Sequence, residues 1–454
     1  MKKSRHELLR SIPKVDTFLG LPVFEGCASK VLLPLIRELF GRLRIAIEEG
    51  KTTDVNAGKL AEEIRQAYDT VMTPSLQSVV NATGVIVHTN LGRSLIDPES
   101  FEKARALACS YNNLEYDLKK GKRGERYSHI TGLMKMLLGC EDVLVVNNNA
   151  AAVFLILNTF AKRKEVIVSR GELVEIGGSF RIPEVMKQSG AKLVEVGATN
   201  KTHLRDYEEA LGERTRLVMK VHKSNYSIEG FTSEVPFAQI RTLAKARGLI
   251  DYYDLGSGHV AELPYGLGQK EPGLHEIMKH DPSLLSFSGD KLFGSVQAGI
   301  IVGKKALISK LKKNQLLRML RVDKVTLAIL AEDVQKMLRD EYEKIPTLRM
   351  LFETEKTLEQ RAEKLKKRLE KSVSCEIVRT QTVVGGGSTP NRKIPSVAVS
   401  VTSGRLGANR IEALFRAQRI IGRIEAGRFL LDLRTVSEDE FYTIEKGAEC
   451  LISS

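Results

Sequence analysis

A lysine and an aspartate in this chain each follow a short apolar run, where an amine and a carboxylate could act on one cofactor. Lys291 closes the segment Ser288-Gly289-Asp290-Lys291 after the run 284–287, and Asp254 ends the run 249–254. Pyridoxal phosphate (PLP) needs these two groups, because an amine forms a Schiff base with it and a carboxylate keeps its pyridine nitrogen protonated. Ser288 is placed to hydrogen-bond the cofactor phosphate. The pair favours a PLP site, whereas a single Ser-x-x-Lys pattern is more often exposed surface.

Three asparagines, Asn147, Asn148 and Asn149, join an apolar strand to the apolar helix expected at 150–161. The free N–H groups at the start of a helix bind anions, and asparagine side chains can add donors. Asn148 and Asn149 are therefore candidate ligands of the cofactor, together with Ser257 just beyond Asp254. The alternative is an asparagine that only caps the helix.

Four arginines stand in settings that suit a small oxyanion. Arg93 follows His88-Thr89-Asn90-Leu91-Gly92, Arg126 lies in a glycine- and charge-rich segment, and Arg318 and Arg321 flank an apolar pair. Positions 318 and 321 share one face of a helix, and two guanidiniums there could hold an anion bidentately. Taken singly, each is more often a solvated charge.

The elements that must position these residues alternate between strands and helices from about residue 74 to residue 305. Strands are expected at 143–146, 166–168, 193–196, 217–221, 249–253, 284–287 and 299–302. Their apolar runs are continuous, which indicates burial on both faces and a mostly parallel α/β sheet with flanking helices. Such sheets bind ligands at the carboxyl ends of their strands. Asn147–Asn149, Asp254 and Lys291 all fall at such ends.

Two further regions flank this core. Apolar residues recur every three or four positions between Leu32 and Leu43, which predicts helices in a domain over 1–73. Beyond the core at 74–305, residues 306–454 should hold linking helices at 327–342 and 353–371, and then a smaller α/β domain. Its strands are expected at 397–401 and 429–433 and its helices at 409–418 and 438–450. Gly385-Gly386-Gly387 lacks the Lys-Ser/Thr of a P-loop and is interpreted as a turn or β-bulge.

The composition is that of a soluble globular protein. The chain has 454 residues, 42% of them hydrophobic, and a formal net charge of +14. That charge suits a polyanionic partner such as nucleic acid, but it is also common without one. Five scattered cysteines without CxxC spacing indicate a reducing compartment and no structural zinc. The run 150–161 is too short to cross a bilayer and no signal peptide is evident, so a cytoplasmic location is expected.

The order of several long motifs resembles the bacterial selenocysteine synthase family, the L-seryl-tRNA(Sec) selenium transferases, over nearly the whole chain. The matching segments are 8–16, 81–93, 113–118, 146–152, 169–183, 220–226, 288–291, 297–299, 318–324 and 431–435. The chain departs from the family pattern at Phe293-Gly294-Ser295-Val296 and in the segment 197–203. These departures spare the lysine, the aspartate and the arginines.

The resemblance implies a fold-type-I PLP core, an N-terminal domain that grips tRNA, and a decamer built as a pentamer of dimers. It implies that Lys291 carries PLP, that Asp254 partners the ring nitrogen, and that Asp290 is catalytic. It also implies that Arg93, Arg126, Arg318 and Arg321 receive the selenium donor, selenophosphate.

The implied reaction removes water from seryl-tRNA(Sec) to give aminoacrylyl-tRNA and then adds selenium at the β-carbon, with Lys291 as the base at Cα. Two alternatives remain from the sequence. One is a PLP-dependent lyase acting on a small amino acid or amino sugar, and the other is a non-catalytic RNA-binding descendant.

Overall fold

The computed structural model describes residues 4–173, 175–176, 180–269 and 271–451, and the chain divides into two compact units, Met1–Ser78 and Val79–Ser454. The first unit is helical: α1 (Arg5–Arg10), α2 (Val15–Leu19), η1 (Pro22–Phe24), α3 (Ser29–Glu48) and α4 (Ala57–Met72). The predicted apolar stripe lies on α3, where Leu32, Ile36 and Phe40 are buried. They pack against Ile64 and Tyr68 of α4, so this unit has a hydrophobic core of its own.

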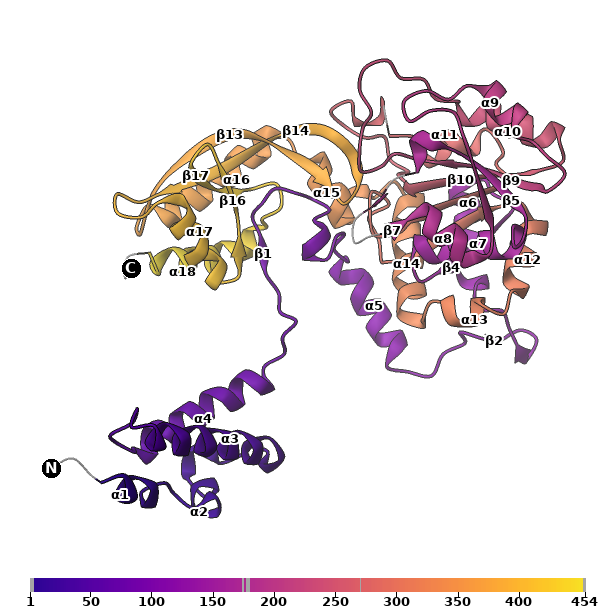
Figure 1. Ribbon diagram of the computed structural model, residues 1–454. Helices are drawn as coiled ribbons and strands as arrows, with labels where there is room; N and C mark the ends of the chain where they lie inside the picture. The colour runs from indigo at the N-terminus through magenta and orange to yellow at the C-terminus, as the bar shows by residue number, and fades with distance from the viewer. Residues whose placement is uncertain (1–3, 174, 177–179, 270, 452–454) are drawn as a thin grey trace. The chain divides into compact units, whose positions relative to one another are not determined.

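The second unit is built on a seven-stranded sheet, visible in Figure 1, in the order β4-β12-β11-β10-β9-β5-β8. The strands are β4 (Asp142–Val146), β5 (Glu165–Ser169), β8 (Lys192–Val196), β9 (Thr215–Val221), β10 (Ile250–Ser257), β11 (Leu284–Ser288) and β12 (Gly299–Gly303). All pairs are parallel except those of β12, which runs antiparallel to both neighbours. The predicted mostly parallel α/β core is confirmed.

Helices cover this sheet because several of its strands are buried along their whole length, namely the edge strand β4 and its neighbours β12 and β11. The helices of this part are α5 (Pro98–Ala108), α6 (Ser128–Leu138), α7 (Asn149–Phe160), α8 (Ile182–Ser189), α9 (Leu204–Glu209), α10 (Phe237–Ala246), α11 (Leu274–Met278), α12 (Lys305–Lys313), α13 (Leu317–Leu320) and α14 (Lys324–Leu338). The apolar α7 packs on β4, β11 and β12. Two small hairpins, β2 (Tyr116–Asp117) with β3 (Lys122–Arg123) and β6 (Glu175–Ile176) with β7 (Phe180–Arg181), lie outside the sheet.

The C-terminal part carries a four-stranded antiparallel sheet in the order β13-β14-β17-β16. Its elements are α15 (Pro346–Phe352), α16 (Glu355–Leu369), β13 (Ser374–Gly385), β14 (Ser388–Thr402), α17 (Ala408–Ala417), β15 (Ile420–Ile421), β16 (Arg423–Glu425), β17 (Arg428–Asp432), η6 (Glu438–Glu440) and α18 (Phe441–Glu449). The sequence missed β13 and placed the start of β14 nine residues late, because the missed residues mix polar and apolar types and contain no continuous apolar run.

Residues just after the first unit also pack against this C-terminal part, where they form a separate two-stranded sheet. The two-residue strand β1 (Val80–Asn81) pairs in parallel with β15, and Val80 and Ala82 pack into the hydrophobic core of the C-terminal part. The sequence prediction had grouped these residues with the core domain that begins at residue 74. The chain therefore passes through the C-terminal part before it enters the seven-stranded core.

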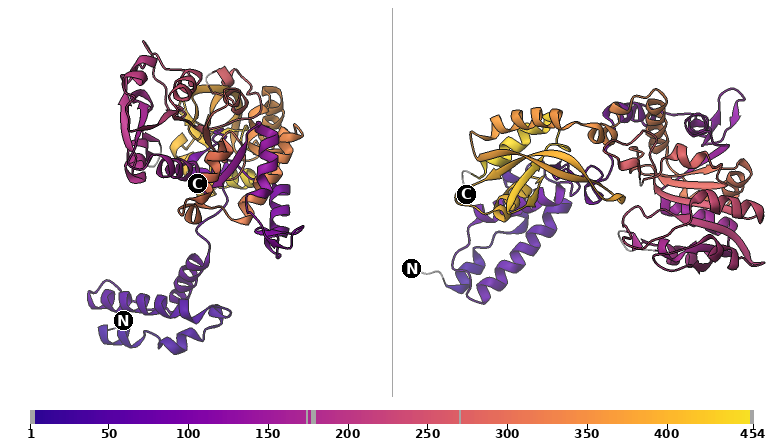
Figure 2. Two further views of the ribbon diagram at one scale, coloured as in Figure 1. Left: turned by 90° about the vertical axis from the view of Figure 1, so that its right-hand side faces the viewer. Right: turned by 90° about the horizontal axis from the view of Figure 1, so that it is seen from above.

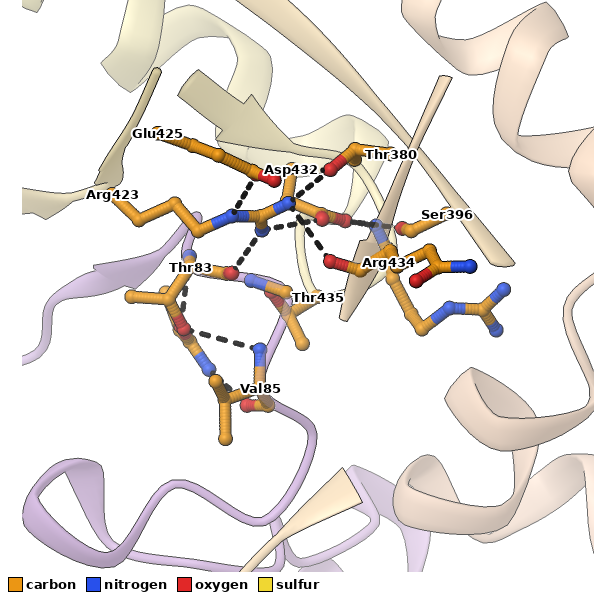
Figure 3. Close-up of polar contacts among 12 residues, drawn as sticks. Thr83, Val85, Thr380, Ser396, Arg423, Glu425, Asp432, Arg434 and Thr435 are labelled. Carbon is orange, nitrogen blue, oxygen red and sulfur yellow. Dashed lines mark hydrogen bonds and ion pairs between the residues drawn. The ribbon is translucent and has the colours of Figure 1, made fainter. Parts of the chain in front are cut away.

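A largely buried network of hydrogen bonds connects residues 83–85 to the four-stranded C-terminal sheet, as Figure 3 shows. Arg423 donates to Asp432 Oδ2 (2.6 Å), to Thr380 Oγ1 (2.9 Å) and to the carbonyl oxygen of Thr83 (2.5 Å). Gly84 N donates to Thr435 Oγ1 (3.1 Å), and a Cβ at residue 84 would lie 2.4 Å from Asp432 Oδ2. Only glycine fits there, so this contact fixes how the following segment, which ends at Arg93, leaves the C-terminal sheet.

Figures 1 and 2 show β13 and β14 as a long hairpin that extends from the C-terminal sheet toward the seven-stranded core. Its turn is Gly386-Gly387, and both residues have positive φ, as the tight turns of hairpins require. The ladder shifts register between Val383 and Gly385. The prediction of a turn or β-bulge at Gly385–Gly387 is confirmed. Among the described residues, no helix is long and apolar enough to cross a membrane.

Candidate functional site

Lys291 lies in the loop that follows β11, at the carboxyl edge of the sheet. Its backbone carbonyl accepts hydrogen bonds from Ser94 Oγ (2.9 Å) and Gly294 N (2.9 Å), so the loop is fixed on both sides. The residue is only 8% exposed. Burial, with the nearby positive charge of Arg93, lowers the pKa of the Lys291 amine below its ordinary value. A larger share of this amine is therefore neutral and nucleophilic near pH 7.

Asp254 lies on β10, the strand next to β11. Asn149 Nδ2 donates to its Oδ1 at 2.7 Å, and Gly256 N donates to the same oxygen at 3.2 Å. Because it is 4% exposed, burial raises its pKa to about 6, against the opposing effects of Asn149 and Lys291. A buried carboxyl of this kind ionises most readily beside a cation, which is what a protonated pyridine nitrogen would provide.

Arg93 and Asp290 form an ion pair next to the lysine. Arg93 Nη1 lies 2.9 Å from Asp290 Oδ2, and the Asp290 side chain is almost wholly buried. The backbone of Arg93 has φ +64°, in the left-handed region that residues with a Cβ rarely adopt. Such strained residues concentrate at functional sites, and here the strain aims the guanidinium at Asp290.

Several buried polar atoms around these residues have no hydrogen-bond partner within the described part of the chain. They are Asn149 Oδ1, Ser224 Oγ, Thr389 Oγ1 and Glu271 Oε1. Buried polar groups in folded proteins nearly always have a partner. Together with Lys291 and Asp254 they fit a polar cofactor with a carbonyl, a ring nitrogen and a phosphate. The residues present thus suit PLP.

The other predicted cofactor-binding residues, Asn148, Ser257 and Ser288, differ in their interactions within the protein. The Asn148 side chain caps α7 by accepting from Ala151 N (2.9 Å), as the capping alternative expected. The Ser257 hydroxyl is bonded to Ser388 Oγ (2.7 Å) on the hairpin. Ser288 is buried at the end of β11, three residues before Lys291.

The structure brings three of the four predicted arginines together and sets Arg93 apart with Asp290. Arg126, Arg318 and Arg321 line a hollow of about 330 Å³ beside the end of β4, with Lys312 and Lys313. Glu115 accepts from Arg126 Nη2 (2.8 Å) and lies 3.4 Å from Arg321 Nη1, and the Arg126 hydrogen bond holds the pKa of Glu115 below its ordinary value. The hollow carries a surplus of positive charge that suits an anion.

Sequence reasoning missed the residues that surround Lys291 from other parts of the chain. Glu271, 1% exposed, lies in a loop without periodicity and gave no signal. Ser224, Thr389 and the tip of the hairpin come from segments far away in sequence. The Gly385–Gly387 run was the one available signal, because successive glycines mark a close backbone approach.

Comparisons with known proteins identify the family of this chain. A family model described as L-seryl-tRNA selenium transferase matches residues 79–437. The L-seryl-tRNA(Sec) selenium transferase of Aliarcobacter butzleri is 57% identical over 447 residues, covering 98% of this chain and 99% of the relative. That of Sulfurimonas denitrificans is 59% identical over 437 residues, covering 96% and 97%.

A solved structure of D-glucosaminate-6-phosphate ammonia-lyase is similar with a TM-score of 0.60 and 20% identity, covering 84% of this chain and 99% of that one. At that identity the likeness shows the fold alone. The chain has the α/β fold of fold-type-I PLP enzymes, as predicted.

Proposed function

The chain belongs to the family of L-seryl-tRNA(Sec) selenium transferases, and we propose that Lys291 and Asp254 carry the chemistry of its reaction. The enzyme converts L-seryl-tRNA(Sec) to L-selenocysteinyl-tRNA(Sec) with PLP as cofactor. Bound PLP supplies an electron sink that weakens the Cα–H and Cβ–O bonds of the seryl group. The observation that carries the residue assignment is the buried Lys291 amine, with its lowered pKa, one strand away from Asp254.

In this proposal Lys291 first holds the cofactor and then acts as the base of the reaction. Its neutral Nζ removes the proton at Cα, and the β-hydroxyl leaves as water with that proton. The selenium atom of selenophosphate adds to Cβ, its bond to phosphorus breaks and water takes the phosphoryl group as phosphate, and one proton at Cα completes the product. Asp254 keeps its negative charge for the ring nitrogen, and Asn149 orients the carboxylate through the 2.7 Å hydrogen bond.

Arg93 and Asp290 adjust the charge around the lysine. Asp290 favours the protonated amine and Arg93 disfavours it. Their ion pair keeps the opposing charges at fixed positions, so we propose that Asp290 belongs to the catalytic residues and that Arg93 orients it.

We propose that Arg126, Arg318 and Arg321 receive the selenium donor, selenophosphate. The donor is a compact anion, and arginine binds oxyanions bidentately. The cationic hollow that these arginines line supports this role.

The helical unit Met1–Ser78 is proposed to grip the tRNA, since paired RNA is recognised by shape and by its phosphates. Deleting residues 1–78 should abolish binding of tRNA(Sec) while PLP loading persists, and an unchanged affinity would contradict the assignment.

The large exposed side chains of Leu107, Tyr111, Leu118 and Met136 support self-association of the enzyme. We propose that the enzyme forms a decamer, which light scattering would test by measuring the mass of the particle. The five free thiols suit the reducing cytoplasm, where we propose that the enzyme acts.

Borohydride reduction followed by peptide mapping tests the central assignment. Reduction makes the bond between PLP and its lysine permanent, so the label should be found on Lys291. Lys220 is the internal control, because it is also buried but is bound to Glu172 at 3.1 Å. A label on Lys220 or on any other lysine would overturn the proposal.

A further inference from the structure

The β13–β14 hairpin projects from its own sheet and ends beside Lys291. β14 pairs with β17 only over Ala398–Val401, and near the tip the ladder is reduced to Val383 with Lys393 and Gly385 with Ser388. An isolated two-stranded hairpin is marginally stable in water. The far end of this hairpin therefore needs contacts with the core to hold a fixed position.

Two buried hydrogen bonds supply such contacts. Ser388 Oγ lies 2.7 Å from Ser257 Oγ, and Leu292 N, the neighbour of Lys291 in the chain, donates to the same Ser257 oxygen at 3.5 Å. Thr389 N donates to Glu271 Oε2 at 3.1 Å. All the side chains of these two contacts are buried, so water does not compete for them.

The glycines of the tip allow it to approach the lysine closely. Cβ atoms at Gly385 and Gly386 would lie 2.4 Å from Val85 Cγ1 and 2.3 Å from Val87 Cγ1, so neither position accepts a side chain. At Gly387 the Cβ position is 3.8 Å from Lys291 Nζ. The backbone of residue 387 thus forms one wall around the amine.

We propose that the hairpin tip, fastened by Ser388 and Glu271, is a positioning device that holds the Lys291 amine in place and keeps water from it. Ser388 and Glu271 are positioning residues that act through Lys291. The inference rests on the proposed role of Lys291 and extends it to the C-terminal part of the chain.

The two fastenings act on the amine in opposite directions. The ionised Glu271 carboxylate raises the pKa of Lys291, so Glu271→Gln should favour loss of the lysine proton at pH values near and above about 8, where Glu271 is ionised. Ser388→Ala should loosen the tip and admit water, which favours the protonated form. Among the described residues, His222 Nδ1 lies 3.8 Å from Glu271 Oε1 and His259 Nε2 lies 3.0 Å from the Glu271 carbonyl oxygen. The charges of Arg93, Asp254 and Asp290 also act on Lys291.

The test is a pH titration of the visible absorption band of the full-length holoenzyme. Relative to the wild type, the midpoint should move to lower pH in Glu271→Gln and to higher pH in Ser388→Ala. The matched control is Ser400→Ala, because Ser400 is a buried serine on the same strand without a hydrogen-bond partner in the described chain. Its midpoint should not move.

The kcat of Ser388→Ala should fall about tenfold, with a smaller change in KM for seryl-tRNA(Sec), since small displacements of a catalytic group lower the rate.

Superimposable titrations of the wild type and both variants would overturn the positioning role, as would shifts of both variants in one direction. If Ser388→Ala fails to fold, the sign of the Glu271→Gln shift still decides. Borohydride mapping of the same samples separates the two proposals. A label on Lys291 with unshifted titrations defeats only the hairpin proposal, whereas a label elsewhere in the wild type defeats the assignment of Lys291.

Discussion

Two clusters of charged side chains in the second unit use the same residue types in different surroundings. In the cluster around Lys291, the lysine residue is 8% exposed and Asp254 is 4% exposed. Around Glu115, the side chains of Arg321 and Glu115 are 37% and 31% exposed. Burial lowers the pKa of Lys291 and raises that of Asp254, whereas ion pairing with Arg126 lowers that of Glu115. The buried cluster is suited to moving protons and the open one to holding charge.

Removing the lysine amine should have the largest effect on this comparison. Lys291→Ala should lower kcat at least about a thousandfold, because the cofactor bond and the base at Cα are lost together. Added methylamine should restore part of the rate, since it replaces the missing amine. The exposed Lys187 on α8 is the control, and its alanine variant should turn over normally. A Lys291→Ala enzyme with more than a tenth of the wild-type rate would contradict the role.

Neutralising Asp254 comes next. Asp254→Asn preserves the size of the side chain but removes the charge that would hold the ring nitrogen protonated, so kcat should fall about a hundredfold. The visible absorption band should persist, because Lys291 remains. Measuring kcat and the spectrum on one preparation separates this loss from loss of the cofactor. Normal turnover in Asp254→Asn would show that no carboxylate is needed at the ring nitrogen.

Substitutions in the arginine cluster around Glu115 should weaken binding of the selenium donor rather than slow the chemical step. Arg318→Ala should raise the KM for selenophosphate about tenfold with a small change in kcat, since one charge-assisted contact to the anion is lost. KM for seryl-tRNA(Sec) should hardly change. Arg205→Ala, on the exposed surface of α9, removes the same charge elsewhere. If kcat fell while KM for the donor stayed constant, the distinction between the two clusters would fail.

The two clusters also differ in how far the sequence predicts them. Lys291 and Asp254 could be identified because each follows an apolar strand, and parallel strands end at one edge of the sheet. The helices α3 and α4 could be predicted because their periodicity is local. Glu271 and the hairpin tip could not, because their contacts with the lysine arise only from the tertiary fold. The separation of Arg93 from the other arginines depends on a left-handed backbone that an arginine does not signal.

Stability against pH should show the smallest effect. Burial raises the pKa of Asp254 to about 6 and of Glu271 to about 8. A carboxyl whose pKa is higher in the folded state contributes stability that is fully present below its unfolded pKa and is lost as the pH rises through the folded value. The cofactor-free protein should therefore melt at lower temperature as the pH rises from about 4 to about 8. Asp254→Asn should reduce this fall in melting temperature up to about pH 6, and Glu271→Gln should reduce it over the whole range up to about pH 8.

Glu115 should give the opposite sign in the same melting experiment. Its pKa is lowered in the folded protein, chiefly by the Arg126 hydrogen bond, so its contribution is present above the unfolded pKa and is lost as the pH falls through the folded one. Glu115→Gln should thus lower the melting temperature near pH 7 and have little effect at acid pH, whereas the two buried variants should stabilise the protein most near pH 8. If all three variants shifted melting in the same direction at every pH, burial would not be what separates the clusters. If the buried variants raise the melting temperature and Glu115→Gln lowers it, the buried carboxyls reduce stability at neutral pH. The Glu115 ion pair, in the cluster proposed to bind an anion, then increases it.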